Sequence, residues 1–243
     1  DLLWMSDTSA FENGKAIRGG IPLCFPWFGP HESDSSKPQH GFARLSEWNV
    51  ISTQQLQDGS TELVLMLKEN EETMKLWPFL FEAELTVVAG AAFSISLQIK
   101  NTGDKTFTYT DALHTYFHIS DLSNIQIAGL AGTSWYNGFA AETTIQQEEV
   151  LTIAAEENRR YINHEKDCVI TDAGYQRKIN VSKTGSKVTV VWNPYTETAK
   201  NISDMPDDGY NTFICVEAAN AYTDAVVLEP GQQHTISQTF SVQ

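Results

Sequence analysis

Short stretches in which apolar and polar residues alternate with a period of two recur along the whole chain. They cover residues 61–68, 81–88, 93–100, 107–111, 187–192, 212–217 and 234–242. A period of two places every second side chain on one face of an extended strand, and each stretch has the length of a strand. Glycine-containing turn signals separate the stretches, and helical periodicity is almost absent. The sequence therefore predicts an all-β fold built from antiparallel sheets.

Other local signals suggest how these strands are organised. A short helical turn is expected at 70–76, where good helix formers precede Trp77-Pro78. No internal repeat or long linker divides the 243 residues, so we expect a single domain, 1–243. This many strands exceed an immunoglobulin-sized sandwich, which leaves a larger two-sheet sandwich or a barrel of the cupin or lipocalin kind. The chain opens on Asp1 in what reads as a strand already under way, so we expect that an N-terminal segment is missing.

The charge balance argues against two classes of partner. Sixteen Lys and Arg residues face 31 Asp and Glu residues, which gives a net charge of −15 and a pI near 4.7. Such a chain has no basic field to attract nucleic acid or an anionic membrane. The apolar runs are also far shorter than the roughly 18 residues that a membrane-spanning helix needs. We therefore expect neither a nucleic acid nor a membrane as partner, and an anionic ligand would have to meet a few local cations.

Cysteine usage bears on the compartment. Cys24, Cys168 and Cys215 contain no C-x-x-C pair, and an odd number of cysteines cannot close into a complete set of disulfides. This pattern favours a reducing compartment, and we expect the protein to be cytoplasmic. The sequence does not fix an oligomeric state, although a monomer is the favoured expectation.

Two proline- and glycine-rich segments carry cations. The first, 17–30, is a rigid irregular loop in which Gly19-Gly20 would let the backbone approach a ligand and Arg18 is one of few arginines. The second segment, 38–44, is a turn that contains His40 and Arg44, two polar groups four residues apart that could each contact a ligand. Imidazole can hydrogen-bond sugar hydroxyls, and guanidinium can bind phosphate through two hydrogen bonds. A core-covering loop with a surface Arg and a structural His is the alternative.

The segment 111–119 is rich in Thr, Tyr, Phe and Ile, which indicates a strand rather than a helix. On a strand, His114, Tyr116 and His118 share one face. The two histidine Cα atoms would then be about 13 Å apart at roughly 3.3 Å per residue, too far for one metal ion. We therefore expect no metal site on this segment, and His114 is either functional or a hydrogen-bonded core histidine.

Two carboxylates stand out in the last third of the chain. Glu217 ends an apolar strand, and burying an unpaired carboxylate is costly unless its pKa rises or it finds a partner. It is therefore either a member of a structural ion pair or a general base. Asp204 lies upstream of Glu217 in turn-rich sequence that follows Trp192, an aromatic residue that could stack on a sugar or simply fill the core.

Motifs that bind nucleotides or dinucleotides, and those of serine hydrolases and zincins, are absent from the sequence. The remaining candidate chemistry is proton transfer between a histidine and a carboxylate, which requires no cofactor.

Taken together, these segments resemble the hexose-6-phosphate mutarotases, or glucose-6-phosphate 1-epimerases, a branch of the aldose 1-epimerase (galactose mutarotase-like) group. The resemblance rests on Arg18-Gly-Gly-Ile-Pro, Gln39-His-Gly-Phe-Ala-Arg, His114-Thr-Tyr-Phe and Cys215-Val-Glu, in the family's order and across nearly the whole chain. The Ala218-Ala219 that follows Glu217 departs from the Pro-Gly of many relatives.

The resemblance implies a fold, an activity and roles for individual residues. The fold would be a large antiparallel β-sandwich, and the activity the interconversion of the α and β anomers of a phosphosugar, with glucose 6-phosphate expected. His114 would be the general acid and Glu217 the general base. The substrate-binding residues would be Arg18, His40, Arg44 and Asp204, the arginines for phosphate and Asp204 for a hydroxyl.

Three alternatives remain beside this interpretation. A mutarotase for unphosphorylated aldoses would keep the acid and base but gain nothing from paired arginines. A non-catalytic carbohydrate-binding β-sandwich would retain the aromatic groove without turnover. A cupin-like metalloenzyme would use several of the six histidines.

Overall fold

The computed structural model describes residues 1–138 and 142–243 and is built almost entirely of antiparallel strands. One sheet runs in the order β1 (Leu23–Cys24), β7 (Asp111–Leu113), β17 (Phe213–Asn220), β16 (Val188–Asn193), β13 (Glu157–Ile162), β10 (Ser134–Asn137) and β11 (Thr143–Ile145), with β8 (Tyr116–His118) also paired to β17. The second runs β12 (Val150–Leu151), β9 (Ile125–Ala128), β14 (Cys168–Asp172), β15 (Arg177–Thr184), β19 (Gln233–Val242), β5 (Phe93–Asn101), β4 (Phe81–Ala89), β3 (Thr61–Lys68) and β2 (Asn49–Gln55).

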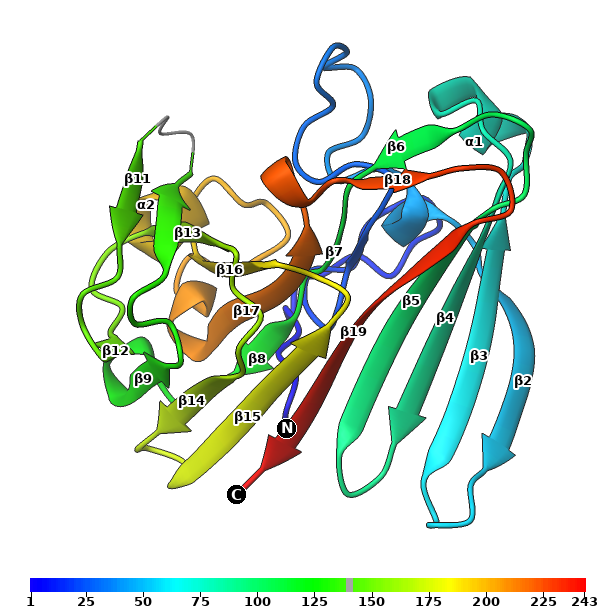
Figure 1. The fold of residues 1–243 in the computed structure, drawn as a ribbon. Coiled ribbons are helices and arrows are strands. Elements are labelled where there is room, and N and C mark those ends of the chain that lie inside the picture. The colour runs from blue at the N-terminus through cyan, green and yellow to red at the C-terminus, as the bar shows by residue number, and fades with distance from the viewer. Residues whose placement is uncertain (139–141) are drawn as a thin grey trace.

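A third, two-stranded sheet pairs β18 (Val226–Leu228) with β6 (Phe107–Tyr109). The helices are short: α1 (Glu71–Leu76), α2 (Tyr195–Ala199) and 3-10 turns at Ala43–Leu45, Leu122–Asn124, Gly209–Thr212 and Tyr222–Asp224. Figure 1 shows β2 to β5, β19 and β15 as one broad sheet, and β17 and β7 of the other sheet contact β19. The predicted all-β sandwich with few helical turns is confirmed.

Most of the predicted elements lie where the alternation placed them. The stretch 61–68 coincides with β3, and β4 and β5 each extend one residue beyond the prediction. Helix α1 begins after Asn70, whose side-chain oxygen accepts hydrogen bonds from the amides of Glu72 and Thr73, so the predicted helical turn is confirmed.

Two predicted strands are interrupted in the structure. The stretch 107–111 divides at Thr110, whose hydroxyl accepts a hydrogen bond from the Phe28 amide and whose own amide donates to Pro26. The stretch 111–119 divides into β7 and β8 at His114 and Thr115, because the His114 amide donates to the Pro22 carbonyl at 3.1 Å instead of to a neighbouring strand. The proline-rich loop 17–30 thus diverts backbone hydrogen bonds that continuous strands would need.

The main core lies between the two large sheets. Phe117 of β8 packs edge-on against Phe240 of β19 with ring centroids 4.9 Å apart, and both side chains are fully buried. Two buried hydrogen bonds also cross the interface: Gln238 donates to the Val216 carbonyl and accepts from the Thr115 hydroxyl at 2.6 Å. Because Thr115 faces this core, its neighbour His114 is turned toward the opposite, outer face of its sheet.

The outer face of the first sheet is covered as well. Strand β17 is buried along its whole length, which explains why residues 213–216 are all apolar instead of alternating as expected for 212–217. Small residues such as Ala112, Ala219 and Cys24 form one cluster on this side, and aromatic residues form another. A polar cavity opens between these two clusters.

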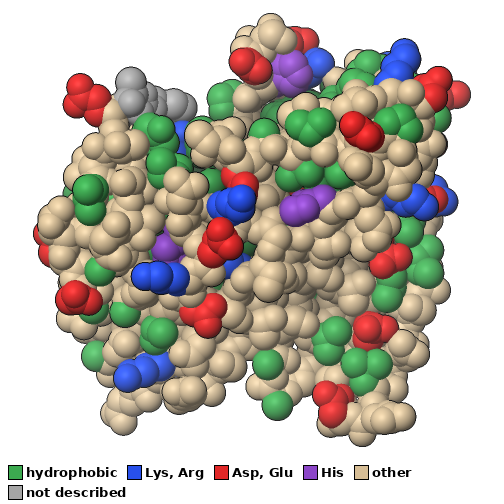
Figure 2. Space-filling view, viewed as in Figure 1, with side chains coloured by type: hydrophobic (Ala, Val, Ile, Leu, Met, Phe, Trp, Pro, Cys, Tyr) green, Lys and Arg blue, Asp and Glu red, His purple; other side chains and the backbone are tan. Residues whose placement is uncertain are grey.

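None of the helices in the described part of the chain is long and apolar enough to cross a membrane. On the face shown in Figure 2, acidic side chains separate the described lysines and arginines, which form no continuous basic patch there.

Candidate active site

Strand register brings the site together in two rows across the outer face of the first sheet. Laterally paired residues of neighbouring strands point to the same face. Arg160 pairs with Val190 and Val190 with Glu217. In the next row, Asn158 pairs with Trp192, Trp192 with Cys215, and Cys215 with Tyr116.

His114 completes the first row. It directly follows Leu113, which is paired with Ala218 of β17, so His114 lies on the far side of Glu217 from Arg160. Both rows face a cavity of about 360 Å³, which is lined by Arg18, Phe28, Gly29, Pro30, Gln39, His40, Arg44, His114, Glu156, Asn158, Arg160, Val190, Trp192, Thr198, Ile202 and Glu217.

His114 and Glu217, the predicted acid and base, are in direct contact. The His114 Nδ1 atom lies 3.4 Å from Oε1 of Glu217, and the two residues are only 8% and 1% exposed. The His114 ring stacks on Tyr116 with centroids 5.0 Å apart and meets Trp192 edge-on. Glu217 Oε2 has no hydrogen-bond partner among the described residues. The aromatic rings thus fix the imidazole, while the carboxyl group keeps an oxygen available.

Burial dominates the electrostatics of this pair. It raises the pKa of Glu217 well above 4.5, and the positive charge of Arg160 offsets this in part. It lowers the pKa of His114 well below 6.5, and His40, Arg44 and Arg18 add to that effect. Both shifts favour the uncharged form of each group. They therefore favour a neutral imidazole beside a protonated carboxyl group.

His40 is the third polar group beside the pair. Its ring meets that of His114 edge-on at 5.7 Å, and the Gly29 amide donates to its Nδ1 at 3.0 Å. An Nδ1 that accepts a hydrogen bond leaves the proton of a neutral imidazole on Nε2. Burial, together with the charges of Arg44, Arg18 and Arg160, lowers the pKa of His40 to about 3. His40 is therefore a neutral hydrogen-bond donor at physiological pH.

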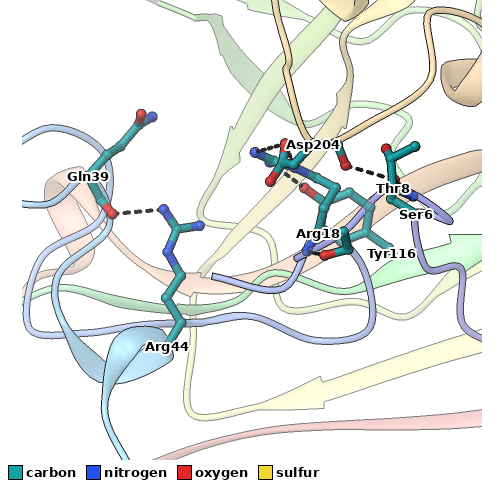
Figure 3. Close-up of polar contacts among 8 residues, drawn as sticks. Ser6, Thr8, Arg18, Gln39, Arg44, Tyr116 and Asp204 are labelled. Carbon is teal, nitrogen blue, oxygen red and sulfur yellow. Dashed lines mark hydrogen bonds and ion pairs between the residues drawn. The ribbon is translucent and has the colours of Figure 1, made fainter. Parts of the chain in front are cut away.

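Arg18 and Arg44 reach the same cavity from different walls, and Figure 3 shows their guanidinium groups facing one another. Arg18 is held by Asp204, which accepts from its Nε at 3.0 Å, and by the Tyr116 hydroxyl. Arg44 donates to the Gln39 carbonyl at 2.9 Å. Asp204 itself lies behind Arg18 and does not line the cavity, so its observed contact is with the arginine.

Gly19 of the first loop serves a different purpose from the one expected. A Cβ atom on Gly19 would lie 2.5 Å from the Met5 Cα atom and the Trp4 carbonyl oxygen, and the residue has a φ of +117°. Its missing side chain therefore lets the loop pack against the N-terminal segment, not against a ligand. The expectation that Gly19 makes room for a ligand is wrong.

Sequence reasoning missed Arg160 and Asn158, which line the cavity from β13. The sequence feature that could have indicated Arg160 is the pair Arg159-Arg160, because arginines are few in this acidic chain. Neighbouring residues of a strand point to opposite faces: Arg159 pairs with Glu157 at 2.6 Å, and Arg160 faces the cavity. Only the pairing of β13 with β16 shows which of them lies near Glu217.

The other histidines lie outside the cavity lining. His118 was expected to share a face with His114, but its ring instead contacts Tyr175 at 5.5 Å. His164 is bonded to Thr189 and Gly129, and His234 to Gly185.

The arrangement is suited to proton transfer rather than to cation binding. One nitrogen, one sulfur and one carboxylate oxygen, from His114, Cys215 and Glu217, lie within 4.8 Å of one another. Three arginines line the same cavity and would repel a metal ion. We therefore assign no metal to these groups.

Comparisons with known proteins agree with this picture. A sequence model of the family described as aldose 1-epimerase matches residues 1–241. A protein of Escherichia coli strain K12 named "Putative glucose-6-phosphate 1-epimerase" is 36% identical over 221 residues, which cover 91% of this chain and 73% of that protein. A protein of the same name from Cenchrus ciliaris is 34% identical over 242 residues, which cover 96% of this chain and 72% of that one. The crystal structure of a "putative mutarotase" from Salmonella typhimurium superposes with a TM-score of 0.91 at 32% identity and covers 99% of this chain and 79% of its own.

Proposed function

Because the chain belongs to the aldose 1-epimerase family, we propose that it is an isomerase that interconverts the α and β anomers of a hexose 6-phosphate, glucose 6-phosphate being the expected substrate. The observation that carries this proposal is the His114–Glu217 contact of 3.4 Å in a cavity that Arg18 and Arg44 also line. The first pair supplies an acid and a base, and the second supplies positive charge for a phosphate.

The proposed reaction begins on the cyclic sugar. Glu217 as carboxylate accepts the proton of the anomeric hydroxyl while protonated His114 donates a proton to the ring oxygen. The C1–O5 bond breaks and an aldehyde forms. Rotation about C1–C2 presents the other face of the carbonyl, and ring closure then returns both protons. An acid and a base of this kind each contribute about 10²–10⁴-fold.

The proton inventory of the pair is constant through this cycle. With the cyclic sugar, the reactive form is protonated His114 beside ionised Glu217. With the open-chain aldehyde, it is neutral His114 beside protonated Glu217. Burial favours the second form, as the two pKa shifts indicate. The reaction of the cyclic sugar therefore requires interactions that offset the free-energy cost of charging these two buried groups.

Phosphate binding would supply part of that offset. Arg18 and Arg44 both lower the pKa of His114. A phosphate bound between them would cancel much of their charge and would make the imidazole easier to protonate. Charge-assisted hydrogen bonds of this type are short and strong, so two local cations can outweigh the repulsion from a chain of net charge −15.

Two further residues have supporting roles in the proposal. His40, held by the Gly29 amide, would donate a hydrogen bond from Nε2 to a sugar oxygen. Asp204, which contacts Arg18, would orient that arginine toward the phosphate instead of binding a sugar hydroxyl directly. This modifies the hydroxyl-binding role expected from the sequence.

The cellular setting is part of the same proposal. All three cysteines are free and buried, which suits a reducing compartment such as the cytoplasm. The substrate would be a small phosphosugar, and we expect the protein to act as a monomer.

The decisive experiment replaces Glu217 with Gln, which is nearly isosteric. Anomer exchange of glucose 6-phosphate is followed by polarimetry on freshly dissolved α anomer or by exchange NMR. We expect Glu217→Gln to lose about 10²–10⁴-fold in rate, whereas Glu156→Gln, a change at the exposed rim of the same cavity, stays close to wild type. Wild-type rates in Glu217→Gln, with its fold verified by circular dichroism, would eliminate the proposed base.

A further inference from the structure

Arg160 occupies a position that the reaction described above leaves without a role. It lies on β13, two strands from Glu217, and the register places Arg160, Val190 and Glu217 in one row on the cavity face. Neighbouring strands are about 4.8 Å apart, so the Cα atoms of Arg160 and Glu217 are separated by about 10 Å. An extended arginine side chain covers much of that distance.

The residue between them does not screen the two charges. Val190 is 1% exposed, and its side chain has no polar atom. It therefore offers neither a hydrogen bond to the Glu217 carboxylate nor a competing charge. A short apolar side chain at this position also leaves the space above the row open to the cavity, which Arg160, Val190 and Glu217 all line.

Among the contacts that hold the guanidinium group of Arg160, two are made with groups other than Glu217. The Arg160 Nη1 donates to the Gly138 carbonyl at 2.6 Å, and the Arg160 Cζ atom lies 4.8 Å from the centroid of the Tyr222 ring. A hydrogen bond on one side and an aromatic face on the other give the group a fixed position. This cationic group therefore has a defined place at the cavity wall.

From these observations we propose that Arg160 is a positioning residue of the reaction: its charge favours the ionised form of Glu217, the form that accepts the proton of the anomeric hydroxyl. The inference rests on the proposed function and deepens it. Arg18 and Arg44 would bind the phosphate, whereas Arg160 would act through the base. This division explains why one small cavity is lined by three arginines of an acidic chain.

Several titratable groups surround Glu217. His114 adjoins it from the β7–β8 bend and Cys215 from its own strand, and the negative charge of Glu217 raises the pKa of the Cys24 thiol and of the Tyr116 and Tyr222 hydroxyls. Burial raises the pKa of both thiols and both phenols, so these groups are uncharged near neutral pH. Arg160 is the cation that lowers the pKa of Glu217.

The test compares Arg160→Gln, Arg160→Met and Arg160→Lys with wild type. Gln keeps an N–H donor for the Gly138 carbonyl, so it serves if the Met variant does not fold. Arg159→Met is the matched control, because it removes the same charge one residue away, where the side chain pairs with Glu157. For each protein, kcat/KM is measured by exchange NMR from about pH 4.5 to 9 with glucose 6-phosphate and with glucose.

We expect the neutral variants to shift the acid limb of the profile upward by about one pH unit, because loss of the positive charge makes the carboxyl group harder to ionise. At the optimum, the rate should fall about tenfold for both sugars alike. In Arg160→Lys, the acid limb of the kcat/KM profile should return most of the way to its wild-type pH. In Arg159→Met, the acid limb should stay at its wild-type pH.

Two results would overturn the inference. An unmoved acid limb in Arg160→Gln and Arg160→Met would show that the charge does not act on the base. A loss confined to glucose 6-phosphate would make Arg160 a phosphate ligand. A wild-type protein without anomer exchange would instead refute the proposed function itself, so the two failures can be told apart.

Discussion

The imidazole of His114 and the carboxyl group of Glu217 lie 3.4 Å apart although they belong to opposite halves of the chain. Thr115 fixes this relationship from the core side. Its hydroxyl donates to Gln238 between the sheets, which turns His114 outward, and Glu217 faces the same way from β17. The contact joins a buried imidazole and a buried carboxyl group, so the protonation of each group depends on that of the other.

Replacement of His114 with Asn should remove most of the activity. We expect kcat for glucose 6-phosphate to fall about 10²–10⁴-fold, because the ring oxygen would lose its proton donor. His118→Asn is the control: it changes a histidine four positions along the same segment, one that contacts Tyr175 outside the cavity. Similar losses in both variants, measured by polarimetry, would mean that the segment matters for folding and not for proton transfer.

Arg44→Ala should separate phosphorylated from free sugars. A lost charge-assisted hydrogen bond is expected to lower kcat/KM for glucose 6-phosphate by about 10–100-fold, with less than about a threefold change for glucose. In the described part of the chain, the side chain of Arg44 makes a single hydrogen bond, to the Gln39 carbonyl, so its removal should disturb the fold little. Equal losses for the two sugars would argue against a phosphate role.

His40→Asn should lower the rate without changing the shape of the pH profile. The pKa of His40 is lowered to about 3, so this residue stays neutral across the range from about pH 5 to 9. Asn suits the site because it tolerates the positive φ of 65° and its oxygen can replace Nδ1 as acceptor for Gly29. A limb of the kcat/KM profile that disappears in this variant would identify His40 as a titrating group.

Asp111 should make the stability of the protein depend on pH. It is fully buried, neither oxygen meets hydrogen-bond geometry with a described residue, and burial raises its pKa to about 8, with partial relief from the Asn220 amide. Because the folded-state pKa lies above the unfolded one, its stabilising contribution is complete below about pH 4 and is lost as the pH rises toward 8. Asp111→Asn should abolish this loss, a difference of about 3 kcal/mol between pH 5 and 7.5.

Asp172 provides the contrast. It is equally buried, but its carboxyl group accepts hydrogen bonds from the amides of Ser120 and Tyr175 and from the Ser120 hydroxyl. Asp172→Asn should therefore destabilise the protein by about 1–3 kcal/mol. Urea unfolding at several pH values measures both effects. A pH-independent difference between Asp111→Asn and wild type would contradict the prediction for Asp111.

The alternation of residues in 61–68, 81–88 and 93–100 was enough to predict β3, β4 and β5, and in β4 and β5 buried side chains do alternate with less buried ones. Segment 111–119 could not be predicted in the same way. The His114 amide in this segment donates to the Pro22 carbonyl on a loop distant in sequence, and a local residue pattern cannot indicate such a partner. The division into β7 and β8 was therefore not predictable from composition or periodicity.

The sequence by itself determined the fold class, through strand periodicity, and the family, through the motifs around Arg18, His40, His114 and Glu217. Both are confirmed, while the residue roles remain predictions. Only the tertiary structure decided which of Arg159 and Arg160 faces the cavity, and that Asp204 holds Arg18. The physical reason is that periodicity gives the two faces of a strand but not its neighbours, whereas a charge acts on whatever lies a few ångströms away in space.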